Sequence, residues 1–222
     1  MKDKTKTLLT GEIQVTPFDS SYNELDRMMF LSKNLYNACL YTERQKFFEK
    51  RDSKDSSLKG FLTNFELSKK LQDEDNPDYR ALPSAVSQQV CKQVYLTYKS
   101  FFSLFKKGMK PKLPKYLDKE KGRNKLSFTK NAFSQTKLKS GIIKFIKFDC
   151  TFKLPEYIEP ESVQQIDIIK NQNRTIKILI IYSVDKVPLK EDNNRVLGID
   201  LGLNNFYNYI IYITNIQHIL KL

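Results

Sequence analysis

The chain has 222 residues, and its 38 lysines and arginines outnumber its 25 aspartates and glutamates to give a formal net charge of +13. This surplus favours a polyanionic partner, usually nucleic acid, although a basic surface can also serve solubility alone. None of the three cysteines belongs to a CxxC pair, so we expect no zinc site built by this chain. No apolar run approaches the ~20 residues of a membrane span, so we expect no membrane partner.

The first residues, "MKDKTKTLLTGEIQ", have no long apolar stretch after their lysines and so do not resemble a secretory signal. An odd number of cysteines without such a signal is typical of a reducing compartment, and we predict a cytoplasmic protein. His218 is the only histidine, so catalysis that depends on a histidine network is not expected.

The N-terminal third predicts one strand followed by helices. Residues 6–16 partly alternate between apolar and polar side chains, which indicates a strand that ends before Pro17. Ser21 and Glu24 have the spacing of a capping box, and the apolar residues after them recur at helical intervals to about residue 50. Residues 61–72 predict a second, shorter helix.

Residues 84–107 carry the clearest helical pattern of the chain. Lys106 and Lys107 would lie in its last turn, where cations complement the helix dipole, and Gly108 is suited to cap it. We interpret its apolar stripe as core rather than as a platform for stacking bases, because its period is regular. The stripe consists of Val86, Val90, Val94, Tyr98, Phe101 and Phe105.

Beyond residue 109 the sequence is rich in proline and lysine and loses the helical period. Strands are predicted at residues 141–150, 162–170 and 174–184, and the last two flank a hairpin turn at "NQN". A connector at 187–194 precedes a final strand, "RVLGIDL".

Most of the excess charge lies between residues 106 and 139, where 12 basic residues face only Asp118 and Glu120. Lysines neutralise phosphates and release counterions, and the interleaved aromatic residues can stack on unpaired bases. The alternative is a solvated charged loop. We predict nucleic-acid contact, of RNA or DNA, by Lys106, Lys107, Lys110, Lys112, Lys115, Tyr116, Arg123, Lys125, Phe128 and Lys130.

The stretch "GIDLGLNNF" places Asp200 between Gly198 and Gly202 at the end of a predicted strand. A carboxylate beside a buried strand is costly unless it is paired or binds a cation, and Mg²⁺ would satisfy it. Two-metal nucleases need several acids around the ions, so Asp200 alone makes an incomplete magnesium site. A strand and turn with a surface aspartate remains an alternative, as does an actin- or Hsp70-like ATPase fragment.

Four stretches together resemble the N-terminal half of the TnpB (OrfB) family of transposon-encoded, RNA-guided DNA nucleases, also described as putative transposases. They are "LSKNLYNACLYTERQKFFE" (31–49), "LPSAVSQQVCKQVYLTYKSFFSLFKKG" (82–108), "KPKLPKYLDKEKGRNKLSFTKNAF" (110–133) and "NRVLGIDLGLNNF" (194–206). The last is similar to the family's first RuvC motif, and the resemblance implies that Asp200 occupies its first metal-ligand position.

The resemblance implies an α+β fold in which a wedge-type β-barrel carries an inserted helical recognition lobe. Residues 1–17 would supply the first barrel strand, 18–109 the helical lobe, 110–187 the rest of the barrel, and 188–222 the start of a RuvC, ribonuclease-H-like domain. Guide RNA and target DNA would be the partners, with RNA–DNA pairing reading the target sequence.

The family's second and third RuvC acids and its zinc ribbon have no counterpart in the last 16 residues, and "YNYIIYITNIQHILKL" departs from the family pattern. We therefore expect a truncated, cleavage-incompetent portion that binds nucleic acid. A repurposed RNA- or DNA-binding regulator is a second hypothesis.

Overall fold

The computed structural model describes residues 6–53, 60–186, 196–200, 208–213 and 216–221, with side chains only as far as residue 186. The chain divides into two units, residues 1–185 and 186–222, each of which is described by itself. Helices and strands both contribute to the first unit, so the predicted α+β class is confirmed.

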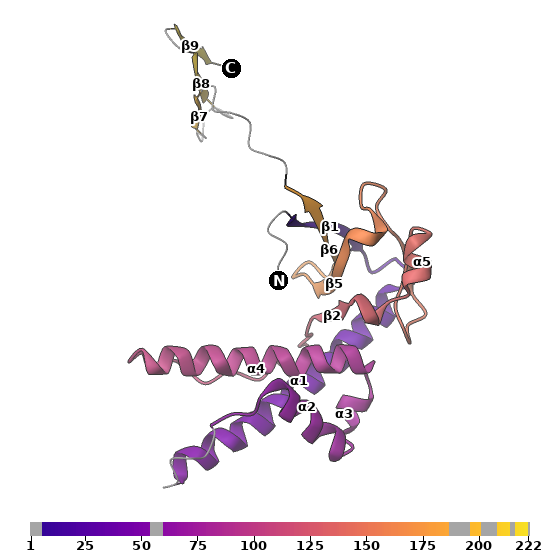
Figure 1. The fold of residues 1–222 in the computed structure, drawn as a ribbon, viewed down its shortest axis with the longest axis vertical. Coiled ribbons are helices and arrows are strands. Elements are labelled where there is room, and N and C mark those ends of the chain that lie inside the picture. The colour runs from indigo at the N-terminus through magenta and orange to yellow at the C-terminus, as the bar shows by residue number, and fades with distance from the viewer. Residues whose placement is uncertain (1–5, 54–59, 187–195, 201–207, 214–215, 222) are drawn as a thin grey trace. The chain divides into compact units, whose positions relative to one another are not determined.

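A four-stranded antiparallel sheet forms one part of the first unit. Its strands are β1 (Lys6–Val15), β6 (Ile176–Asp185), β5 (Val163–Lys170) and β2 (Leu126–Thr129), in the order β1-β6-β5-β2. Lys6 lies opposite Asp185 and Val15 opposite Ile176, so the first strand joins the same sheet as strands from more than a hundred residues later (Figure 1). A bulge interrupts the β5–β6 register between Val163 and Gln165.

The predicted closed barrel is not present in the described residues, where the sheet is open. Closure would require β1 to pair with β2. Among the described residues β1 pairs only with β6 and β2 only with β5, so both are edge strands; β2, which is four residues long, packs against α4 (Ser84–Lys106).

The hairpin predicted around "NQN" joins β5 and β6. The Asn171 amide donates to the Thr175 carbonyl at 2.8 Å, and Arg174 adopts a left-handed conformation with φ of 64°. Apolar residues of β6 then alternate into the core, which fixes the register because a one-residue slip would expose them all. The buried side chains of β6 are Ile176, Ile178, Ile180 and Tyr182.

The strand predicted at 141–150 is wrong beyond its first residues. Only β3 (Ile142–Lys144) is a strand, and it pairs with β4 (Thr151–Lys153) as a separate two-stranded sheet. Lys147 has a φ of 64°, a left-handed conformation that turns the chain within the predicted segment. Short elements complete this region: η1 (Lys130–Ala132), α5 (Gln135–Lys139) and η2 (Pro160–Ser162).

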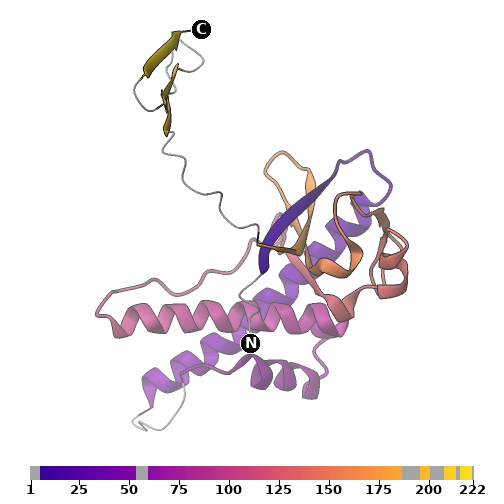
Figure 2. The same cartoon turned by 45° about the horizontal axis from the view of Figure 1, so that its top comes forward.

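Two long helices dominate the helical part of the first unit. α1 (Tyr22–Asp52) packs against α4, and the shorter α2 (Asn64–Asp73) and α3 (Pro77–Arg80) lie beside them (Figures 1 and 2). The predicted core stripe of α4 is buried from Val86 to Phe101, but Phe105 is 62% exposed. The last residue of the predicted apolar stripe therefore lies on the surface and not in the core.

The predicted capping box at Ser21 is wrong, and a capping box forms at α2 instead. Ser21 has helical backbone angles (φ −78°, ψ −13°) and makes no side-chain cap, while Glu24 bonds Arg27. Thr63 is extended (φ −72°, ψ 162°), so its hydroxyl accepts from the Glu66 amide, and the Thr63 amide donates to the Glu66 carboxylate. The backbone of an N-cap residue must be non-helical for its side chain to reach the amides of the first helical turn. Of Ser21 and Thr63, Thr63 meets that condition and Ser21 does not.

Gly108 ends α4 as predicted. It has a φ of 77°, its amide donates to Phe105, and the Met109 amide donates to Leu104. These two bonds form a Schellman motif, which needs a left-handed residue at the position of Gly108.

The second unit contains three antiparallel strands in the order β7-β8-β9. They are β7 (Val196–Asp200), β8 (Asn208–Ile213) and β9 (Ile216–Lys221). β7 confirms the strand predicted in "RVLGIDL", and Asp200, its last residue, lies opposite Asn208.

Candidate nucleic-acid interface

The basic segment is not a free loop: residues 109–125, here called the strap, run along the two long helices (Figure 2). The Asn37 side chain donates to the Leu117 carbonyl at 3.0 Å and accepts from the Leu117 amide at 2.9 Å. The Lys33 ammonium donates to the Lys119 carbonyl at 2.6 Å. Lys33 and Asn37 are one helical turn apart, so one face of α1 holds the strap.

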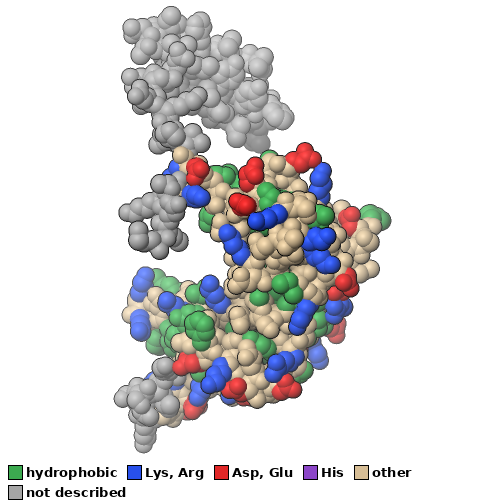
Figure 3. Space-filling view, turned by 45° about the vertical axis from the view of Figure 1, so that its right-hand side comes forward, with side chains coloured by type: hydrophobic (Ala, Val, Ile, Leu, Met, Phe, Trp, Pro, Cys, Tyr) green, Lys and Arg blue, Asp and Glu red, His purple; other side chains and the backbone are tan. Residues whose placement is uncertain are grey.

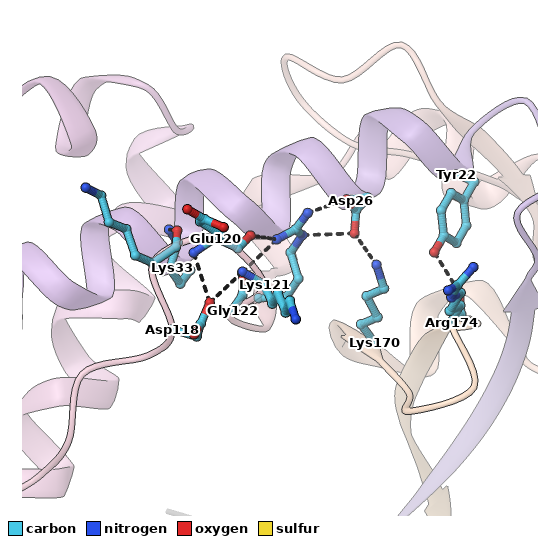
Figure 4. A network of polar contacts seen from close by, with 11 residues as sticks. Tyr22, Asp26, Lys33, Asp118, Glu120, Lys121, Gly122, Lys170 and Arg174 are labelled. Atoms are coloured by element: carbon cyan, nitrogen blue, oxygen red, sulfur yellow. Dashed lines mark hydrogen bonds and ion pairs between the residues drawn. The ribbon is translucent and has the colours of Figure 1, made fainter.

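The end of the strap is clamped by an ion-pair triad that Figure 4 shows from close by. Asp26 on α1 accepts from Arg123 at 2.8 Å and from Lys170 on β5 at 2.6 Å. Burial alone would raise the pKa of Asp26, but the hydrogen bonds from Arg123 and Lys170 outweigh it and hold that pKa below its usual value. The triad joins strap, helix and sheet, so Arg123 is a structural contact rather than a free phosphate ligand.

Tyr116 is partly occupied in the same way. The Arg44 guanidinium lies over its ring at 4.3 Å from the centroid, and Arg44 also donates to the Pro114 carbonyl. One ring face is thus covered by a cation. Tyr116 fixes the strap to α1 through this contact, and stacking on a base would be restricted to its other face.

Replacing Asn37 with alanine is expected to loosen the strap. The change removes both side-chain hydrogen bonds to Leu117, worth about 1 kcal/mol each. Limited trypsin digestion should then cleave faster at the exposed Lys115, Lys119 and Lys121, as followed by mass spectrometry. Asn34→Ala, on the same helix, is the matched control and should leave the cleavage rate unchanged. Equal rates in both variants would contradict the anchoring role.

A groove of about 720 Å³ lies between α4, the strap and the sheet. α4 contributes Gln89, Lys92 and Gln93, and the strap contributes Lys112 and, at its end just before β2, Lys125. No acidic side chain lines it within the described part of the chain. Of the groove lysines, Lys125 forms an ion pair with Asp167, at 3.5 Å between its ammonium and the carboxylate.

This arrangement can bind an extended polyanion. The lysines supply cations for phosphates, while Gln89 supplies an amide that can meet sugar or base edges. Lys92 also begins a row with Lys99 and Lys106, seven residues apart and therefore about 10.5 Å apart on one face of α4. All three are exposed. A row of this length matches a chain of phosphates better than a single small anion.

The structure brings together only some of the predicted contact residues. Lys112 and Lys125 line the groove. Lys106 and Lys107 lie exposed in and just after the last turn of α4, and Lys110 and Lys115 are exposed on the strap. Lys130 is exposed on η1, outside the groove lining.

Phe128 is a correction to the predicted site. Its side chain is 0% exposed in β2, and its ring lies 4.2 Å from that of Phe145 and 5.4 Å from that of Phe148. Phe133, another aromatic residue of the basic segment, is also buried. A base cannot reach either ring without unfolding this core, so both serve packing rather than stacking.

The predicted magnesium ligand, Asp200, ends β7, and its side chain lies outside the described residues. Elsewhere in the described chain, no three His, Cys, Asp or Glu side chains are grouped so that they could hold a metal ion. Of the predicted magnesium site, the described backbone gives only the position of Asp200 at the end of β7.

Sequence reasoning missed the α4 side of the groove, which includes Gln89 and Lys92. A signal was present: residues 81–117 contain seven lysines and not one acidic residue. This acid-free run begins well before residue 106, where the basic segment starts, and it includes all of α4. The absence of acids from residues 81–117 therefore indicates α4 as a second side of the candidate interface.

Fold and groove define a mixed α+β protein with a lysine-rich groove that carries no acid among its described lining residues. None of the helices described is long and apolar enough to cross a membrane. No protein-family model matches the chain, and no curated protein matches it.

Proposed function

We propose that this chain binds nucleic acid as the counterpart of the N-terminal portion of a TnpB-like protein. In this proposal the open sheet serves as the wedge-type module, and α1 to α4 form the recognition lobe inserted between β1 and β2. The observation that carries the proposal is the groove, where Lys92, Lys112 and Lys125 converge without a lining acid among the described residues.

The electrostatics favour a polymer of phosphates. The strap and the exposed face of α4 present lysines on both sides of one groove, and the described chain provides no ion pair for Lys92 or Lys112. Each phosphate that such a lysine neutralises releases a counterion, which makes binding favourable and salt-dependent. A scattered basic surface that served solubility alone would not need lysines from both α4 and the strap in one groove.

The proposal assigns binding, and not cleavage, to this chain. By resemblance, Asp200 would be the first of several acids that hold Mg²⁺ in a RuvC-type nuclease. Two-metal hydrolysis requires several carboxylates around the ions. The groove residues need no metal to bind phosphates, so the proposed function does not depend on Asp200.

Changing Lys92, Lys112 and Lys125 together to glutamine is expected to weaken RNA binding. Fluorescence anisotropy with a labelled single-stranded RNA, repeated over a salt series, measures both affinity and its salt dependence. Loss of three phosphate contacts should lower the slope of log K against log salt by about 2 and reduce affinity roughly tenfold or more near physiological salt.

A matched control carries the same charge change elsewhere. Lys137, Lys139 and Lys144 lie exposed on α5 and β3, outside the groove lining, and their triple glutamine variant should keep the wild-type slope. Equal behaviour of the two triple variants would contradict the groove. Tight ATP binding by a wild-type protein that binds no RNA would instead favour the ATPase-fragment hypothesis.

A further inference from the structure

The C-terminal end of α4 carries an apolar surface that the core does not use. Leu104 is 36% exposed, Phe105 62% and Met109 55%. The Schellman motif explains two of them, because it usually brings the residues at the positions of Leu104 and Met109 into contact. Phe105 has no such role, and its exposure is not required by the helix cap.

Phe105 continues an aromatic series from the core to the surface. Its ring is stacked on that of the buried Phe101, with centroids 6.4 Å apart and planes at 21°. Phe101 in turn packs edge-on against Phe47 of α1 at 5.8 Å. Phe101 is therefore fixed by the core, and Phe105 rests against it. Because this contact already restricts the Phe105 side chain, Phe105 would lose less side-chain entropy on stacking against a base.

The surroundings of Phe105 are cationic. Lys106, Lys107 and Lys110 are exposed and form no ion pair within the described part of the chain. Glu49 and Asp52, acids of the last turns of α1, are themselves paired with Lys46 and Arg51. Figure 3 shows hydrophobic side chains bordered by lysine and arginine side chains on the helical part of the molecule.

This surface is continuous with the groove. Phe101 and Leu104 line the groove, and Phe105 lies next to them in the last turn of α4. The helix C-terminus itself carries partial negative charge and would not attract a phosphate, so the lysines must supply the cations and the ring an uncharged contact. An exposed aromatic ring next to a basic groove, with three exposed lysines within the following five residues of the chain, is complementary to a nucleotide with an unpaired base.

We propose that Phe105 stacks on an unpaired base of a nucleic-acid strand that leaves the groove, with Lys106, Lys107 and Lys110 contacting its phosphates. This inference rests on the proposed function and adds single-strand selectivity to it. A base within a duplex presents no free face, so the contact requires a single-stranded segment of RNA or DNA.

The chain contains no tryptophan, so Phe105→Trp creates a single fluorescent reporter at the proposed contact. Adding single-stranded RNA should quench this fluorescence, and a duplex of the same sequence should quench it less. Phe18→Trp is the matched control, since Phe18 is 97% exposed and precedes α1. Its fluorescence should not change with either RNA. Equal quenching at the two positions would overturn the proposal.

Phe105→Ala should weaken binding of the single strand roughly 5- to 150-fold, the loss of one base–aromatic stack. The loss should persist at high salt, because stacking is uncharged, whereas the loss caused by the triple lysine variant should shrink. If wild type binds RNA and the lysine variant is impaired but Phe105→Ala is not, only the stacking inference fails. If wild type binds no RNA, the proposed function fails. Binding to vesicles containing phosphatidylserine that is lost in Phe105→Ala, without an effect on RNA, would overturn stacking in favour of a lipid surface.

Discussion

Replacing Phe128 with alanine is expected to lower the free energy of unfolding by about 3–5 kcal/mol, the usual cost of removing a buried aromatic ring. The ring is completely buried between β2 and the segment that contains Phe145 and Phe148. Its removal leaves a cavity where three aromatic rings now meet, and the rigid sheet limits how far that cavity can collapse. Urea denaturation followed by circular dichroism measures the change directly.

Phe105→Ala provides the comparison, because it makes the same chemical change at an exposed position. Its stability should remain within about 0.5 kcal/mol of wild type. The two phenylalanines thus separate packing from binding: Phe128 should affect stability, and Phe105 should affect RNA affinity. A Phe128→Ala protein as stable as wild type that had lost RNA binding would restore Phe128 to the interface and contradict its burial.

Local patterns were sufficient to predict α1, α4 and the β5–β6 hairpin. Each has a long period or a characteristic turn, and these depend on residues close together in the sequence. The capping box is a feature that the local sequence pattern alone does not predict correctly. Ser21 and Thr63 are both followed three residues later by glutamate, but only the backbone angles at Thr63 allow the reciprocal bonds. Such angles depend on how the preceding chain packs.

The candidate interface was harder to predict because it is built from distant pairs. Arg123 bonds Asp26 across 97 residues, and Asn37 bonds Leu117 across 80. No spacing rule connects such partners. Lysine-rich sequence also concealed the buried strand β2, whose four residues are too few to show an alternating pattern. Charge composition predicts which segment would carry the candidate interface, whereas only the fold separates the anchors of that segment, such as Arg123, from its exposed lysines.

Glu43 is the most deeply buried acidic side chain in the part of the chain that the structure describes. It lies on α1 with its side chain fully buried, and its Oε2 accepts from the Leu62 amide at 2.9 Å. Its Oε1 has no hydrogen-bond partner among the described residues. Burial raises the pKa of Glu43 to about 7; the Leu62 hydrogen bond lowers it in part, and the charge of Glu66 adds to the rise.

The raised pKa predicts how stability depends on pH. Below about pH 4.5 both folded and unfolded states hold the proton, and Glu43 contributes no pH dependence. Between about pH 4.5 and 7 the unfolded chain ionises first, so the free energy of unfolding falls with pH and reaches a loss of about 3 kcal/mol above pH 7. Asp26, whose pKa is lowered, acts in the opposite direction and at lower pH.

Glu43→Gln should therefore be more stable than wild type at about pH 8, by up to about 3 kcal/mol, and similar to it near pH 4.5. Glutamine keeps an oxygen for the Leu62 amide but cannot ionise. Urea unfolding of both proteins across this pH range measures the difference. Glu49→Gln is the control, since Glu49 is exposed on the same helix and pairs with Lys46. A Glu43→Gln difference that stayed constant with pH would mean that Glu43 ionises normally in the folded protein. A difference that grows with pH as predicted would show that Glu43 is a neutral carboxylic acid in the folded protein near pH 6. Because the Leu62 amide lies just before the capped first turn of α2, this neutral acid would join α1 to the start of α2.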